Sequence, residues 1–261
     1  MSSEPGKPVA KRAKQSSWSQ RILAIVGYGL WVALVFAASQ ALLVVLIVLL
    51  DRVGIYTYDP SHLLVALGIG VLAYVAMLAM TIGIPRWALK KATSLRELGL
   101  RGLMTWQEIG IALAGMVTYF VLTGVLLYAA QQFLPWIDIE QAQDLGLGMP
   151  SVGIEMAMAF LLLVVIAPFV EELLFRGYLF GKLRGSGVPF WLTALVVSLL
   201  FGIAHLQWNV GVDTFALSLV MCATREITGS LWPSVLMHMM KNGIAFYFLF
   251  VNPQAIQSLV G

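Results

Sequence analysis

The sequence predicts an all-α membrane protein, a bundle of about seven transmembrane helices (six to eight) around a polar intramembrane cavity. Of its 261 residues, 60% are hydrophobic and only 11% are charged, whereas soluble domains carry roughly 25% charged residues. Apolar stretches close to the roughly 20 residues that span a bilayer recur along the chain. Ionisable residues inside such stretches occur only in the second half. This composition excludes a nucleic-acid-binding domain, a disulfide scaffold and a disordered regulator.

Seven apolar stretches account for the predicted helices. The first, residues 22–50, contains no charge and is too long for a signal-peptide core of roughly 7–15 residues, which predicts an uncleaved spanning helix. The sixth is short and could be re-entrant or merge differently with its neighbours. The remaining predicted spans, the sixth included, are residues 63–84, 109–130, 152–180, 189–205, 212–225 and 233–250.

Basic residues predict the orientation of the bundle. Of the 16 Lys and Arg residues, five lie in the tail 1–21, five between residues 86 and 101, and two in the loop at 182–184. The opposite loops contain Arg52 and an acidic stretch at 136–144. By the positive-inside rule, the N terminus is expected in the cytoplasm. Together with the compact size, this pattern favours a bacterial plasma membrane.

The same features divide the chain into four regions. Residues 1–21 form a basic, solvated cytoplasmic tail, and residues 22–150 contain the N-terminal transmembrane helices. Within them, the segment 86–106 alternates Leu and Trp with basic residues, as in a helix lying in the membrane interface. Residues 151–250 contain the ionisable groups, and residues 251–261 form a C-terminal tail.

Two adjacent glutamates in the fourth stretch differ in their expected partners. Glu172 and Arg176 are four residues apart, which places them on one helix face as an ion pair. Glu171 points about 100° away and has no partner among its sequence neighbours. Such a carboxylate suits a general base that acts on water. The alternative is that both glutamates only tie helices together.

Two histidine motifs follow in later stretches. His205 lies four residues after Phe201, and His238 shares a helix face with Asn242. Imidazole and carboxamide groups in one cavity with a free carboxylate could bind water and stabilise an oxyanion. The alternative is hydrogen bonding between helices. Three other residues have simpler expectations: Cys222 is a packing residue, Lys241 is ion-paired or reaches toward the interface, and Asp213 starts a helix and faces water.

In this order the motifs resemble those of the CPBP intramembrane proteases, which include CAAX prenyl endopeptidases and bacterial Abi proteins. The resemblance covers roughly residues 150–245, including the approach to the last motif at residues 228–238. It implies an intramembrane endopeptidase that hydrolyses peptide bonds of membrane-associated proteins or peptides. The family pattern is matched by Glu171, Glu172, Arg176, Phe201, His205, His238 and Asn242.

The resemblance also implies roles for these residues. Glu171, together with His205, would activate water, while His238 and Asn242 would help to hold the oxyanion. Glu172, Arg176 and Phe201 would support the site.

Descriptions of the family conflict on metal use, since both metalloprotease and metal-free mechanisms are assigned to it. The chain has no His-Glu-x-x-His pair. The prediction is therefore that no cofactor is required. The alternative is a divalent metal such as zinc, held by Glu171, His205 and His238.

Two further functions stay open from the residues alone: a non-proteolytic membrane scaffold or bacteriocin-immunity protein, and a proton-coupled transporter. The depth of the motifs is also open. Perpendicular helices place Glu171 and His238 in the cytoplasmic half and His205 nearer the outer side. Helix tilt, a kink near Pro168 or a fourth helix that extends to about Arg184 could bring them together. In any of these functions, the partners expected are the lipid bilayer and a membrane protein or peptide, and not nucleic acid.

Overall fold

The computed structural model describes residues 16–54, 63–134, 136, 149–151 and 153–254, and within these ranges the chain forms helices and no strand. Residues 1–15 of the basic tail, residues 137–148 with the acidic stretch, and residues 255–261 of the C-terminal tail lie outside the described residues. The helices are α1 Trp18–Arg52, α2 Leu63–Ala88, α3 Trp106–Phe133, α4 Ile154–Phe160, η2 Leu161–Ile166, α5 Ala167–Glu172, η3 Leu173–Leu179, α6 Phe180–Gly185, α7 Phe190–Ile203, α8 Trp208–Thr228, α9 Trp232–Phe246 and η4 Tyr247–Val251.

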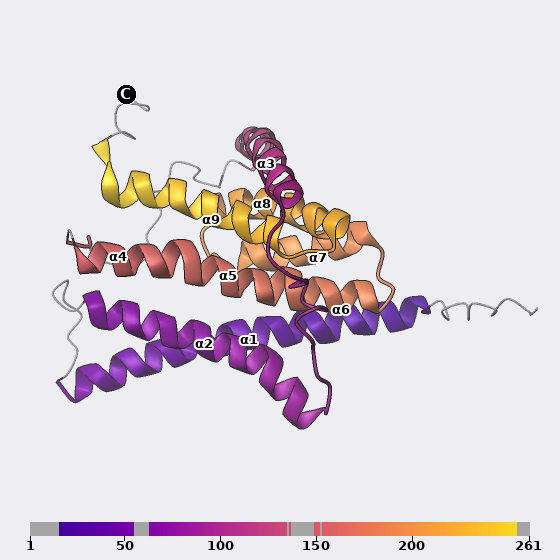
Figure 1. The fold of residues 1–261 in the computed structure, drawn as a ribbon, viewed down its shortest axis with the longest axis horizontal. Helices are drawn as coiled ribbons and strands as arrows, with labels where there is room; N and C mark the ends of the chain where they lie inside the picture. The colour runs from indigo at the N-terminus through magenta and orange to yellow at the C-terminus, as the bar shows by residue number, and fades with distance from the viewer. Residues whose placement is uncertain (1–15, 55–62, 135, 137–148, 152, 255–261) are drawn as a thin grey trace, which may run out of the picture.

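The predicted all-α membrane bundle is confirmed. Segments α4 to α6 form one continuous helix through the middle of the bundle, with α1 and α2 on one side and α7, α8 and α9 on the other (Figure 1). Helix α3 crosses over α8 and α9 at a steep angle. Five helical segments in the described residues are long and apolar enough to span a membrane: α1, α2, α3, Ile154–Gly185 and Trp232–Val251.

Capping residues explain why two helices begin before their apolar stretches. The Ser17 side chain accepts a hydrogen bond from the backbone N–H of Gln20, whose side chain accepts one from the N–H of Ser17. Thr105 and Glu108 form the same reciprocal pair at the start of α3. Each pair satisfies backbone donors that a helix start leaves free. The helices therefore begin at Trp18 and Trp106, three or four residues earlier than hydrophobicity predicts.

The length of the central helix decides the open question of depth. It runs from Ile154 to Gly185, so the extension to about Arg184 is the correct alternative. Glu171 lies 14 residues before Gly185, and His205 lies 15 residues after the start of α7 at Phe190. Because α6 and α7 are joined by a short turn, both residues are about 20 Å from the same end of the bundle.

Residues 89–105 are not helical, so the prediction of a helix over residues 86–106 is wrong. Helix α2 continues to Ala88, and residues 89–105 form turns, bends and irregular backbone. The carbonyls of Gly99 and Gly102 accept hydrogen bonds from the Leu231 N–H and the Trp232 indole N–H. Leu98 is buried against Gly177 of η3. These carbonyls bond the start of α9, and the tertiary contacts prevail over the local helix pattern.

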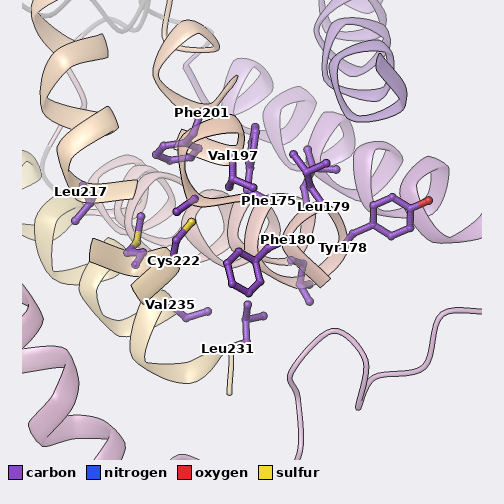
Figure 2. Close-up of a cluster of buried hydrophobic side chains, with 14 of the residues drawn as sticks. Phe175, Tyr178, Leu179, Phe180, Val197, Phe201, Leu217, Cys222, Leu231 and Val235 are labelled. Atoms are coloured by element: carbon purple, nitrogen blue, oxygen red, sulfur yellow. The ribbon is translucent and has the colours of Figure 1, made fainter. Parts of the chain in front are cut away.

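The apolar core packs where the central helix meets α7, α8 and α9. Cys222 is fully buried in it, as the sequence predicts for a packing residue. Side chains from all four segments meet there, including Phe175, Leu179, Phe180, Val197, Phe201, Leu217, Cys222, Leu231 and Val235 (Figure 2). This packing fixes the relative positions of the three motif-bearing segments.

Helices α7 and α8 approach closely at two glycines, and this contact allows a test. Substitution Gly202→Ala is expected to lower the free energy of unfolding by about 1–3 kcal/mol, as overpacking does. The added Cβ would lie 2.8 Å from the carbonyl oxygen of Gly211, a backbone atom that cannot rotate away. The control is Gly124→Ala in α3, whose added methyl group meets nothing within 4 Å. Thermal unfolding of both purified variants measures the difference, and equal melting temperatures would contradict the close packing.

Candidate active site

One cavity of about 190 Å³ collects the residues that the motifs single out. It lies between α2, the central helix, α9 and the turn that follows α7. Glu171, His205, His238 and Asn242 all line it. The remaining lining residues are Tyr74, Leu163, Ala167, Lys241, Ala245, Phe246, Leu249 and Phe250. The structure therefore brings together all four residues predicted to act chemically.

Glu172 and Arg176 form the predicted ion pair beside this cavity. Arg176 Nη1 donates to Glu172 Oε1 over 2.8 Å, and both side chains are fully buried. The same oxygen lies 3.0 Å from His238 Nδ1. Because an ionised carboxylate can only accept, Nδ1 of His238 carries the hydrogen. This contact fixes the ring of His238 and directs its Nε2 toward Glu171.

Glu171 has a different environment from its neighbour. Its Oε2 lies 3.8 Å from His238 Nε2, and the Tyr74 hydroxyl donates to its Oε1 over 2.9 Å. No lysine or arginine in the described residues forms an ion pair with it. Its side chain is 13% exposed, whereas that of Glu172 is fully buried. Glu171 is thus the carboxylate that faces the cavity.

Tyr74 is the residue that the sequence analysis missed. It lies in α2, 97 residues before Glu171, within a stretch that contains no charged residue. A tyrosine in an apolar helix gives no signal by its spacing. Only the packing of α2 against the central helix shows that it contacts the site.

His205 is positioned by the end of α7. Its Nδ1 lies 2.8 Å from the carbonyl oxygen of Phe201, which can only accept, so Nδ1 carries the hydrogen and Nε2 is left as an acceptor. The next residue, Leu206, has a φ of +57°, a left-handed conformation that costs about 1–2 kcal/mol for a side chain with a Cβ. This turn ends the helix and leaves His205 at the cavity wall.

Phe201 connects the charged pair to both histidines. It is fully buried, and the Arg176 guanidinium lies over its ring, 4.3 Å from the centroid. Its ring also packs edge-on against those of His205 and His238, at centroid distances of 5.0 and 5.5 Å. The predicted supporting residue is therefore a packing contact shared by three polar side chains of the site.

Asn242 is held by an irregularity in the central helix. Its Nδ2 donates to the carbonyl oxygen of Leu163 over 2.9 Å. Leu163 belongs to the π-helical segment η2, where a carbonyl pairs with the N–H five residues later. For Leu163 that residue is Pro168, which has no N–H. Asn242 thus satisfies a carbonyl that the helix leaves free, and its second amide hydrogen remains for the cavity.

The alternative zinc set of Glu171, His205 and His238 stays a prediction. In the residues that the structure describes, no three His, Cys, Asp or Glu side chains are grouped so that they could hold one metal ion. Tyr74 donates to Oε1 of Glu171, and Nδ1 of His238 contacts Glu172, so that Glu171 Oε2 and His238 Nε2 lie 3.8 Å apart.

Asp213 and Lys241 form a second ion pair next to the cavity. Asp213 lies one turn inside α8, and its Oδ1 accepts hydrogen bonds from the hydroxyls of Tyr119 and Thr123. The expectation that it starts a helix and faces water is wrong, because α8 begins earlier, at Trp208. The expected ion pairing of Lys241 is confirmed, since its Nζ lies 3.5 Å from Asp213 Oδ2.

Comparisons with known proteins agree with the motif pattern. Residues 153–244 match the family model described as type II CAAX prenyl endopeptidase Rce1-like. Over 164 residues, the chain is 28% identical to the membrane-embedded CAAX protease MroQ of Staphylococcus aureus (strain USA300). That match covers 59% of this chain and 62% of MroQ. Residues 153–244 are thus similar to a CAAX protease family, as the motif pattern predicts.

The matched region contains all four motif residues of the cavity, whereas Tyr74 is contributed by an N-terminal helix outside it. A second relative, an uncharacterized 24.3 kDa protein of Escherichia coli, is 32% identical over 98 residues, which are 36% of this chain and 45% of that protein. The chain thus matches less than two thirds of the length of either relative. No solved structure matches it.

Proposed function

We propose that this chain is an intramembrane endopeptidase that hydrolyses peptide bonds of membrane-associated proteins or peptides. The observation that carries the proposal is the convergence of Glu171, His205, His238 and Asn242 on one cavity inside a helical membrane bundle. The domain match and the name of the S. aureus relative support the same class of reaction.

In the proposed reaction, Glu171 accepts a proton from a water molecule as the water oxygen attacks the peptide carbonyl. The Tyr74 hydroxyl holds one carboxylate oxygen in place, so that the other faces the cavity. His205 Nε2, which has no hydrogen-bond partner among the described residues, orients the second hydrogen of the water. General base catalysis of this kind typically contributes about 10²- to 10⁴-fold in rate.

The oxyanion and the leaving group use the other two residues. The second amide hydrogen of Asn242 donates to the developing oxyanion, and removing one such donor typically costs about 10²- to 10³-fold in kcat. His238 Nε2 lies beside Glu171, where it exchanges a proton with the carboxylate before the proton passes to the leaving amine. Water and the peptide bond are thus converted to an acid and an amine without a cofactor.

We further infer that the N terminus lies in the cytoplasm of a bacterial plasma membrane. The distribution of basic residues supports this orientation. Both relatives are bacterial proteins, which agrees with such a location.

The test of the function compares protein termini in membranes of cells that express the wild-type or the Glu171→Gln chain at matched levels. New N and C termini that appear only with the wild-type chain would establish proteolysis and identify the substrate. Identical termini, together with a wild-type phenotype of the variant, would instead favour a non-catalytic scaffold.

Substitution Tyr74→Phe is expected to lower kcat about tenfold and to leave the fold intact. It removes the one hydrogen bond that holds Glu171 Oε1, and hydrogen bonds to charged groups contribute about 1.5–3 kcal/mol. Turnover of a substrate found in the termini comparison measures the effect. The control is Tyr128→Phe in α3, where the side chain is 67% exposed. Equal turnover of both variants would show that Tyr74 does not position the carboxylate.

A further inference from the structure

Lys241 is a charged residue of the cavity to which neither the motif pattern nor the proposed reaction assigns a role. It lies one residue before Asn242 on α9, and its side chain lines the cavity together with that of Glu171. The side chain is only 15% exposed. A lysine placed there brings a positive charge close to the position where the peptide bond must lie.

The ion pair with Asp213 leaves N–H donors of the Lys241 ammonium group unused. The distance of 3.5 Å from Nζ to Asp213 Oδ2 exceeds the roughly 2.7–2.9 Å of a strong charged hydrogen bond. A lysine ammonium has three N–H donors. Asp213 is held on its other oxygen by Tyr119, at 2.6 Å, so it stays close to α3. At least two donors of Lys241 are therefore available for a ligand.

The charged groups at this end of the cavity are Glu171 and Lys241 on its lining and Asp213, the ion-pair partner of Lys241. Among the described lining residues, Glu171 and Lys241 are the two that carry a charge irrespective of histidine protonation. Glu171 repels an acidic substrate, and a carboxylate inside a membrane is costly without a cation. Lys241 supplies that cation on the wall of the same small space.

We propose that Lys241 binds a carboxylate of the substrate, within one or two residues of the bond that is cut. This inference rests on the proposed function and specifies the substrate class. The cavity of about 190 Å³ is smaller than the roughly 300–1,000 Å³ of typical ligand sites, so only a short segment fits beside Glu171. The carboxylate is either the C terminus of the substrate or an Asp or Glu side chain.

A purely structural role makes a different prediction. The pair between Lys241 and Asp213 also links α9 to α8 and, through Tyr119, to α3. If Lys241 served only to link these helices, Asp213→Asn and Lys241→Gln would have the same effect on substrate binding. If Lys241 binds the substrate, Asp213→Asn retains the cation and its binding, whereas Lys241→Gln removes it.

The test measures peptide binding to the full-length chain in lipid nanodiscs, with Glu171→Gln as the background that prevents turnover. Three apolar probe peptides of one sequence are compared: one with a free C-terminal carboxylate, one with a C-terminal amide, and one amide with an internal Glu. At least one carboxylate peptide is expected to bind about tenfold more tightly than the plain amide. Lys241→Gln should abolish this preference, whereas Lys241→Arg and Asp213→Asn should retain it.

The outcomes separate this inference from the proposed function. Equal affinity for acid and amide peptides, no binding of any peptide, or equal loss of preference in Lys241→Gln and Asp213→Asn would overturn the inference. Cleavage of all three peptides by the wild-type chain at equal kcat/KM would also overturn it, while supporting the endopeptidase function. Selective binding without any cleavage by the wild-type chain would support the role of Lys241 and contradict the proposed function. The carboxylate peptide that binds more tightly identifies the source of the group.

Discussion

Replacement of Glu171 by glutamine is expected to lower kcat by about 10²- to 10⁴-fold, the range that a general base contributes. Glutamine has nearly the same shape as glutamate but cannot accept a proton from water. The fold should persist, because Glu171 has no arginine or lysine partner in the described residues. The Tyr74 hydroxyl can still donate to the amide oxygen in place of the carboxylate oxygen.

Two measurements on the purified chain check this expectation. Turnover of a membrane peptide substrate reports the chemical step, and thermal unfolding in detergent reports the fold. The melting temperature of the variant should stay close to that of the wild-type chain. Turnover at the wild-type rate in a pure preparation of Glu171→Gln would exclude Glu171 as the general base.

The same substitution one residue later, Glu172→Gln, is expected to act on folding first. It leaves the Arg176 guanidinium fully buried without a counterion, and removing one partner of a buried ion pair costs about 3–5 kcal/mol. Folded proteins are stable by only about 5–15 kcal/mol, so this loss is a large share of the total. The variant should therefore show a much lower melting temperature and reduced abundance in membranes.

A double variant separates the two consequences of losing Glu172. Replacing the pair together, Glu172→Gln with Arg176→Met, removes the uncompensated charge and should recover most of the stability. Activity should stay low, because His238 Nδ1 lacks its anionic acceptor and the ring is no longer fixed. Comparing melting temperature and turnover across the four chains of this cycle tests the assignment. A stable Glu172→Gln single variant would contradict the buried pair.

These two glutamates show how far neighbouring residues of one type can differ. They share a helix segment and differ by about 100° in direction. Because of that rotation, the Glu172 carboxylate contacts a buried arginine and a histidine. The Glu171 carboxylate accepts from a tyrosine and faces the cavity. Glu172 is thereby part of a buried ion pair, whereas Glu171 faces the cavity, as the proposed general base must.

The sequence by itself determined the fold class, the approximate spans and the motif residues of the site. Apolar stretches long enough to cross a bilayer have few alternatives, because a backbone in lipid must satisfy its own hydrogen bonds. The pair of Glu172 and Arg176 was equally predictable, since residues four apart meet within one turn of helix. Each of these features depends on interactions within a single segment.

Only the tertiary structure decided which groups from different segments meet. In it, Tyr74 donates a hydrogen bond to Glu171, and Asn242 donates one to the free carbonyl of Leu163. Asp213, expected to face water, accepts a hydrogen bond from Tyr119. The tertiary structure also replaced the expected helix at 86–106 by turns whose carbonyls bind the start of α9. The physical reason is common to all four. A hydroxyl, a carbonyl or a carboxylate accepts many partners of equal chemistry, and the packing of helices far apart in the sequence selects one of them.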